Sequence, residues 1–271
     1  MIQPSDEHLP DPSELERELA RFAAQVQQSD GGDALDFSYV ALDRVEAYLG
    51  SALKSGTPDR NALLNDAAWY VGETLARNTG GVWALRRDTQ GRKRPHVTRL
   101  PELGKYAFLP SRVVSHFARA QLPRILRDRT EVYDIPHRRR FMDLLLASRE
   151  PELAALDTDV QNLLGDGKKL DRQLASLDRV EEAIARLIAS QAPNARVREM
   201  QARAVLHVGE VMKEALPEAS WHICTEPENA AIGELVIADF APMDVIRYIT
   251  PGEPPGVLRK RVEFELKARQ G

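Results

Sequence analysis

The segment Leu-Asp-Arg-Val-Glu occurs twice in this chain, at residues 42–46 and again at 177–181. One match of five residues proves little by itself, so its weight depends on whether other matches occur after it. Further matches do occur, in the same order and at similar spacing. The matching pairs are Val71-Gly72-Glu73 with Val208-Gly209-Glu210, Trp83 with Trp221, and Phe108-Leu109-Pro110 with Phe240-Ala241-Pro242. The sequence therefore predicts two units that arose by tandem duplication.

Hydrophobic spacing and turn residues predict the element order α-α-β-β-(β)-α in both units. After a first helix capped by Asp11, the first unit is expected to contain a helix that ends at Gly50, a helix from Thr57, strands at 82–85, 96–100 and 106–109, a turn at 88–91, and a helix from Pro110. The second unit is expected to contain helices at 168–190 and 194–216, strands at 221–225 and 232–238, and a helix after Pro242. Small antiparallel sheets with helices beside them define the α+β class.

The same pattern divides the chain into four parts. They are an N-terminal helix at 1–35, the first α+β unit at 36–135, connecting helices at 136–167, and the second unit at 168–271. The turn sequence Gly-Asp-Gly at 165–167 marks the last of these boundaries, because glycine ends helices readily.

Two glycines lie in the middle of predicted helices, where glycine costs about 1 kcal/mol relative to alanine. Because Gly72 and Gly209 recur at the same place in both units, we expect a neighbouring element to approach too closely for a Cβ. A ligand site lined by backbone is the alternative. Glu73 and Glu210 come next, and we expect each to hold a backbone amide or a tryptophan indole N–H rather than to act in catalysis. The residues expected to be structural are Gly72, Glu73, Trp83, Pro110, Gly209, Glu210, Trp221 and Pro242.

The net charge of −4 conceals a strong segregation of charge along the chain. From Arg86 to Arg140 the chain has fifteen basic and five acidic residues, whereas residues 205–255 have two basic and nine acidic residues. Opposite charges of this kind favour docking of the units or of two chains, an acidic protein partner, or nucleic acid bound to the basic segment. The residues expected to bind the partner are Arg86, Arg87, Arg92, Lys93, Arg94, Arg138, Arg139 and Arg140.

Catalytic and cofactor motifs are absent from the sequence. It contains no Gly-x-Ser-x-Gly, His-Glu-x-x-His, Gly-x-Gly-x-x-Gly or Walker-type pattern. His207, Glu210, His222 and Cys224 are of metal-binding types, but their spacing matches no zinc signature, and Cys224 is typical of a small apolar strand residue. We therefore expect no enzyme activity, no metal and no cofactor. Whether those four side chains converge stays open.

The sequence also favours a cytoplasmic protein. No apolar run approaches the roughly 18 residues of a membrane span, and the acidic N-terminus lacks the features of a signal peptide. The single cysteine cannot form an internal disulfide, which is typical of a reducing compartment.

Three motifs of the first unit resemble a group of uncharacterised bacterial domains, some of which look like immunity proteins encoded beside toxin genes. The resemblance is carried by Val71-Gly72-Glu73, Gly80-Gly81-Val82-Trp83 and Phe108-Leu109-Pro110, with a weaker echo in the second unit, where Pro217-Glu218-Ala219-Ser220 replaces the double glycine. It implies a protein-binding role and no catalytic residue.

These observations lead to three hypotheses for the function. The first is a non-catalytic protein-binding module, such as an immunity or adaptor protein, that covers an acidic surface or a toxin. The second is a nucleic-acid-binding or regulatory protein that uses the basic face 86–140. The third is a metal-dependent enzyme centred on the second unit.

Overall fold

The computed structural model describes residues 9–56, 58–87, 91–120, 124–226 and 229–270, so most of the predicted turn at 88–91 lies outside the described residues. The chain divides into two compact units, residues 1–137 with 225–227 and residues 138–224 with 228–271. Within the described ranges, every helix is too short or too polar to cross a lipid bilayer.

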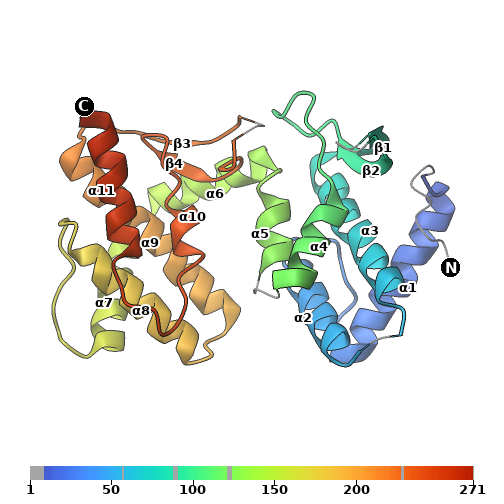
Figure 1. Cartoon of the computed structure of the whole chain (residues 1–271), viewed down its shortest axis with the longest axis horizontal. Helices are drawn as coiled ribbons and strands as arrows, with labels where there is room; N and C mark the ends of the chain where they lie inside the picture. The colour runs from blue at the N-terminus through green and yellow to red at the C-terminus, as the bar shows by residue number, and fades with distance from the viewer. Residues whose placement is uncertain (1–8, 57, 88–90, 121–123, 227–228, 271) are drawn as a thin grey trace. The chain divides into compact units, whose positions relative to one another are not determined.

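The first unit packs helices around a central helix and adds a hairpin (Figure 1). Its elements are α1 (Pro12–Asp30), α2 (Ala41–Lys54), α3 (Arg60–Thr79), β1 (Val82–Arg87), β2 (Lys93–Thr98), α4 (Pro110–Ala120) and α5 (Ile125–Glu131). The central helix is α3, which contacts α1, α2, α4, α5 and β2. As predicted, α1 begins after Asp11, whose carboxylate accepts a hydrogen bond from the amide of Ser13 at 2.9 Å.

The second unit also packs its helices around a central one, α9, which contacts α7, α8, α10 and α11. Its elements are α6 (Ile135–Ala147), in which the boundary between units falls, α7 (Arg149–Leu164), α8 (Ser176–Ala189), α9 (Asn194–Ala215), β3 (Trp221–Ile223), β4 (Leu235–Ile237), α10 (Met243–Ile246) and α11 (Val257–Gln270). The connecting helices predicted at 136–167 correspond to α6 and α7.

Each unit contains one two-stranded antiparallel sheet among its described residues. β1 pairs with β2 in the register Val82↔Thr98, and β3 pairs with β4 in the register Trp221↔Ile237. The predicted third strand at 106–109 is reduced to one bridge, between Phe108 and Val97, because the chain leaves the ladder at once to begin α4. Helices beside small antiparallel sheets confirm the α+β class.

Two predicted helix ends were wrong. α2 continues through Gly50 to Lys54, because Gly50 keeps helical backbone geometry and meets nothing closer than the Phe117 ring at 3.9 Å from the place of a Cβ. α8 begins at Ser176 and not at 168, since residues 168–175 form a loop whose amide at Leu170 is bonded to the Asp157 carboxylate.

The repeated pentapeptide makes equivalent contacts in the two units. Its leucine and valine are fully buried in both copies, as Leu42 and Val45 on α2 and as Leu177 and Val180 on α8. Three residues apart on a helix, they form one apolar face that packs into the core. The two copies therefore contribute the same part of each core.

The glutamate of the pentapeptide binds the N-terminus of the last helix in its unit. The buried carboxylate of Glu46 accepts hydrogen bonds from the backbone amides of Arg124 and Leu126, the latter at 2.9 Å, where α5 begins. Glu181 accepts from Leu258 at 3.0 Å and from Gly256, where α11 begins. A negative charge at a helix N-terminus satisfies free amides and interacts favourably with the helix dipole.

The central aspartate and arginine of the pentapeptide form equivalent ion pairs. The aspartate pairs with an arginine of α5 or α11, and the arginine pairs with an aspartate at the end of the preceding helix or just after it. The pairs are Asp43–Arg127 (3.2 Å), Asp178–Arg259 (3.3 Å), Arg44–Asp30 (2.7 Å) and Arg179–Asp166 (2.7 Å). The whole segment thus ties three elements of each unit together.

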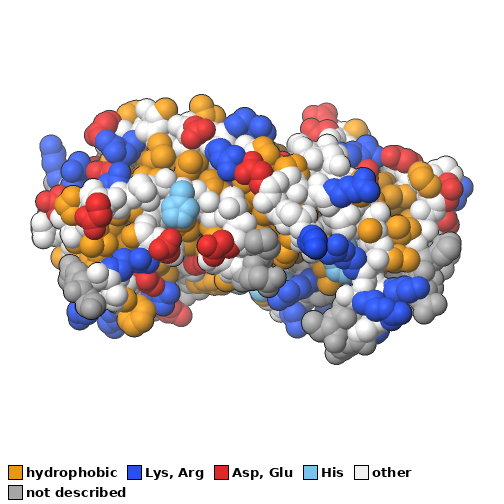
Figure 2. Space-filling view, turned by 90° about the horizontal axis from the view of Figure 1, so that it is seen from above, with side chains coloured by type: hydrophobic (Ala, Val, Ile, Leu, Met, Phe, Trp, Pro, Cys, Tyr) orange, Lys and Arg blue, Asp and Glu red, His pale blue; other side chains and the backbone are white. Residues whose placement is uncertain are grey.

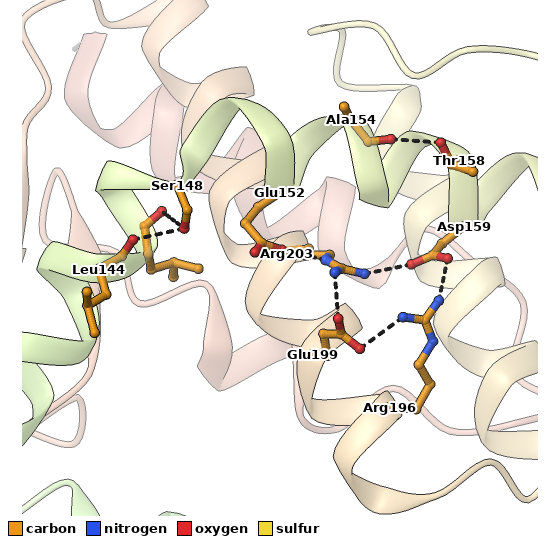
Figure 3. Close-up of polar contacts among 10 residues, drawn as sticks. Leu144, Ser148, Glu152, Ala154, Thr158, Asp159, Arg196, Glu199 and Arg203 are labelled. Atoms are coloured by element: carbon orange, nitrogen blue, oxygen red, sulfur yellow. Dashed lines mark hydrogen bonds and ion pairs between the residues drawn. The ribbon is translucent and has the colours of Figure 1, made fainter.

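An ion-pair network joins α7 to α9 in the second unit (Figure 3). The buried side chain of Arg203 on α9 contacts Glu152 at 2.6 Å and Asp159 at 2.9 Å on α7, and Glu199 at 2.5 Å on its own helix. Arg196 pairs with Asp159 and Glu199 as well. Asp159 and Glu199 are each shared between two arginines, so the network orders several side chains together. The charged groups of this network are therefore already engaged within the unit.

Candidate partner-binding surface

The hairpin β1–β2 is attached to α3 through Trp83. A Cβ placed on Gly72 would lie 2.1 Å from Cη2 of Trp83 and 2.7 Å from Cγ of Pro110. An ordinary van der Waals contact of a Cβ begins at about 3.4 Å, so only glycine lets the indole lie this close to the helix backbone. Pro110 is buried at the first position of α4 and closes the other side. These three residues fix where the hairpin leaves the unit.

A hydrogen bond fixes the orientation of the same indole. The N–H of Trp83 donates to Oε2 of Glu73 at 2.8 Å, and Arg77 donates to Oε1 of the same carboxylate at 2.8 Å. Both carboxylate oxygens are thereby used in structural contacts.

The second unit repeats the packing without this hydrogen bond. A Cβ on Gly209 would lie 1.9 Å from Cζ2 of Trp221, so the same close approach is present. Glu210, however, pairs with Arg149 at 3.5 Å and Arg172 at 3.3 Å, and among the described residues the indole N–H of Trp221 has no hydrogen-bond partner. The contact expected between Glu210 and Trp221 is therefore not made, because two arginines hold the carboxylate. Pro242 is buried just before α10.

Four of the predicted basic residues face one another across the hairpin. In the ladder Arg86 lies opposite Arg94, and Arg87 lies opposite Lys93. Residues directly opposite share a face of the sheet, so the first pair is on one face and the second pair on the other. Both faces of the hairpin end are therefore positive.

Backbone carbonyls hold two of these guanidinium groups. Arg86 donates to the carbonyl of Lys105 at 2.8 Å, and Arg87 donates to the carbonyl of Gly91 at 2.8 Å. Such bonds orient the guanidinium groups without neutralising their charge. Arg86, Arg87, Arg92 and Lys93 are exposed, and Arg94 is half-buried.

The three arginines of α6 do not form one surface with each other. Arg138 is buried in the second unit, where it donates to the carbonyl of Gly233 at 2.8 Å and lies 3.4 Å from Glu234. Arg139 and Arg140 are exposed. Since the guanidinium of Arg138 is enclosed, this residue does not belong to a partner-binding surface.

The four residues of metal-binding type, His207, Glu210, His222 and Cys224, do not form a metal site among the described residues. Oγ of Ser176 lies 2.8 Å from Nε2 of the buried His207, and burial lowers the pKa of His207 to about 4. His222 is exposed and Cys224 is buried, while Glu210 faces its two arginines. In the described ranges no three His, Cys, Asp or Glu side chains are grouped to hold a metal ion.

Charges of both signs lie side by side on the surface. In the view of Figure 2, Asp and Glu side chains lie among Lys and Arg side chains in both halves of the face shown. The ion pairs agree with this view, because several acids of residues 205–255 pair with arginines of the second unit, and one of these acids, Glu234, also contacts Arg138 of the basic segment. The pairs are Glu210–Arg172, Glu234–Arg247, Asp239–Arg269 and Asp244–Arg247.

The sequence patterns do not single out Trp69, although it belongs to the same surface. Its ring lies 4.7 Å from that of Trp83, at an interplanar angle of 58°. The available signal is its spacing, because Trp69 precedes Gly72 by three residues and so shares a helix face with it. A second tryptophan on the face that accommodates Trp83 predicts an aromatic cluster.

No protein-family model matches the sequence, and no curated protein or solved structure matches it. Thus no family match supports the resemblance to immunity-like domains. The hairpin and its surroundings are therefore the basis for assigning a function.

Proposed function

We propose that this chain is a non-catalytic protein-binding module whose basic hairpin covers an acidic surface of a partner protein. An immunity or adaptor protein acting by occlusion is the class that fits this role. Positive charge on both faces of the hairpin would speed association with an acidic surface, and the rigid attachment through Trp83 would lower the entropic cost of binding.

The single observation that carries the proposal is the facing of like charges in the ladder. A two-stranded hairpin is only marginally stable, and like charges directly opposite weaken it by roughly 0.2–1 kcal/mol per pair. Two such pairs occur together, Arg86 with Arg94 and Arg87 with Lys93. Binding of an anionic partner would offset this cost.

The acids of the second unit support an external partner. Glu210, Glu234, Asp239 and Asp244 each pair with an arginine of their own unit. Glu234 also lies 3.4 Å from Arg138 of the basic segment, whereas the other three acids pair with arginines outside that segment, which weakens the case for their docking onto its exposed arginines.

We also infer that the two units descend from one duplicated unit and that the protein works in the cytoplasm. The equivalent contacts of the two pentapeptides and of the Gly–Trp pairs support the duplication. The buried free thiol of Cys224 is compatible with a reducing compartment.

Fluorescence anisotropy with labelled deca-glutamate tests the proposal, with ten-nucleotide DNA and RNA as competitors. We expect the peptide to bind at low salt, and the variant R87Q/K93Q to bind about tenfold more weakly. The matched control is R17Q/K54Q, which removes the same charge from exposed positions on α1 and α2.

Equal losses in both variants would mean that only net charge matters, and the hairpin proposal would be wrong. Oligonucleotides that bind more tightly than the peptide, with a steep fall in affinity as salt rises, would replace it by the nucleic-acid function.

A further inference from the structure

A small cavity opens beside the basic hairpin in the first unit. It has a volume of about 50 Å³. Apolar walls are formed by Trp69, Trp83, Pro95, Pro110 and Ala68, and the polar rim by Asn65, Ser111 and Arg94. Binding sites in proteins are usually apolar hollows with a few polar groups, and this cavity is far smaller than a typical site for a whole small molecule.

The two indoles give the cavity its shape. With ring centroids 4.7 Å apart and planes inclined by 58°, they form two walls that meet at an angle rather than a flat platform. The wall from Trp83 is fixed by its close contact with Gly72 and by its hydrogen bond to Glu73. A preformed cavity of this kind binds its occupant at a low entropic cost.

This geometry favours a small saturated ring over a nucleobase. A stacked base needs an open, parallel aromatic face, whereas the inclined indoles leave a space that holds only a few water-sized volumes. Aromatic-lined grooves in other proteins accept proline, because its ring is compact and its backbone is already restricted.

The charge at the rim indicates what flanks that ring. Trp83 and Pro95 lie on the same face of the hairpin as Arg87 and Lys93, because residues two apart on a strand share a face, so the occupant enters on the side that carries these two positive charges. We infer that the cavity binds a proline within an acidic peptide segment of the partner protein. This inference rests on the proposed function and adds to it the residue that is recognised.

The equivalent position in the second unit suggests a suitable variant. The offset of 137 between Gly72 and Gly209 aligns Trp69 with Leu206, which is buried on α9. Leucine is thus compatible with this place on the central helix. Since Trp69 is only half-buried, W69L removes one wall of the cavity without opening a large void in the core.

Isothermal titration with three capped peptides tests the inference. Each carries three glutamates on both sides of a central proline, alanine or glycine. We expect the proline peptide to bind about tenfold more tightly than the other two, and W69L to remove this preference. A second variant, N65F, narrows the cavity while both tryptophans stay in place, and it should remove the preference as well.

The outcomes separate the cavity from the hairpin. If all three peptides bind equally and R87Q/K93Q weakens all of them, the hairpin function stands and the cavity inference is overturned. If none of them binds, the proposed function fails together with it. An oligouridylate that displaces the proline peptide from wild type but not from W69L would identify the cavity as a base-binding site and overturn the inference too.

Discussion

Replacing Gly72 by alanine should destabilise the first unit although alanine is the better helix former. In an exposed helix the change would gain about 1 kcal/mol. Here the new Cβ would lie 2.1 Å and 2.5 Å from two atoms of the Trp83 ring and 2.7 Å from Pro110. Overpacking of this kind costs about 1–3 kcal/mol, and more if the indole is displaced and its hydrogen bond to Glu73 is lost. After the gain of about 1 kcal/mol is subtracted, we expect a net loss of up to about 2 kcal/mol, and a larger one if that hydrogen bond is lost.

Gly50 supplies the matched control for this prediction. It also lies inside a helix, α2, but the nearest atom to a Cβ would be Cζ of Phe117 at 3.9 Å, an ordinary contact. G50A should therefore stabilise the protein by about 0.5–1 kcal/mol. The two substitutions are chemically identical, so the difference between them isolates the effect of the Trp83 ring.

Urea unfolding followed by far-UV circular dichroism measures both variants without relying on tryptophan emission. The double variant G72A/W83L should regain part of the stability lost in G72A, because the smaller side chain leaves room for the methyl group. The reasoning is refuted if G72A is as stable as G50A, or if W83L has no effect on the loss caused by G72A.

Three further predictions concern charge. Burial raises the pKa of Glu46 to about 7, so the native state holds this proton more tightly than the unfolded state does. The free energy of unfolding should therefore fall as pH rises from about 4.5 to about 7. In urea titrations at several pH values, E46Q should remove up to about 3 kcal/mol of this decrease. Burial lowers the pKa of His207 to about 4, so its effect on stability has the opposite sign. The stabilisation is present above about pH 6.5 and is lost as pH falls towards 4. H207Q should flatten this part of the plot of unfolding free energy against pH, and an unchanged plot would contradict the burial argument. Lys93 lies opposite Arg87, so K93E should replace a repulsion by an attraction and stabilise the protein by about 0.2–1 kcal/mol in thermal melts. The same variant should bind deca-glutamate more weakly. A K93E protein that is less stable as well as weaker in binding would count against the like-charge argument.

The sequence predicted much of the local structure because its signals act over short distances. Asp11 before Pro12 predicted the start of α1, and the glycines inside predicted helices indicated close approach by a neighbouring element. The stop predicted at Gly50 was wrong, since a glycine ends a helix only where the chain needs a left-handed residue, and the need for one depends on the packing of the elements around it.

The candidate site could be predicted only in part. The basic residues of the hairpin are visible in the sequence, but their opposition depends on the strand register, which pairs Arg86 with Arg94. The sequence grouped Arg138 with its neighbours on α6, although its guanidinium is buried beside Glu234, which is 96 residues away.

The sequence by itself determined the α+β class, the recurrence of the pentapeptide and the two places where a glycine faces a closely packed neighbouring element, because these depend on neighbouring residues and on periodicity. Only the tertiary structure decided what the recurring carboxylates do. Glu46 reaches an amide 80 residues further on, and Glu73 holds an indole while its counterpart Glu210 is held by two arginines. Long-range contacts of this kind depend on how whole helices pack, which no local pattern contains.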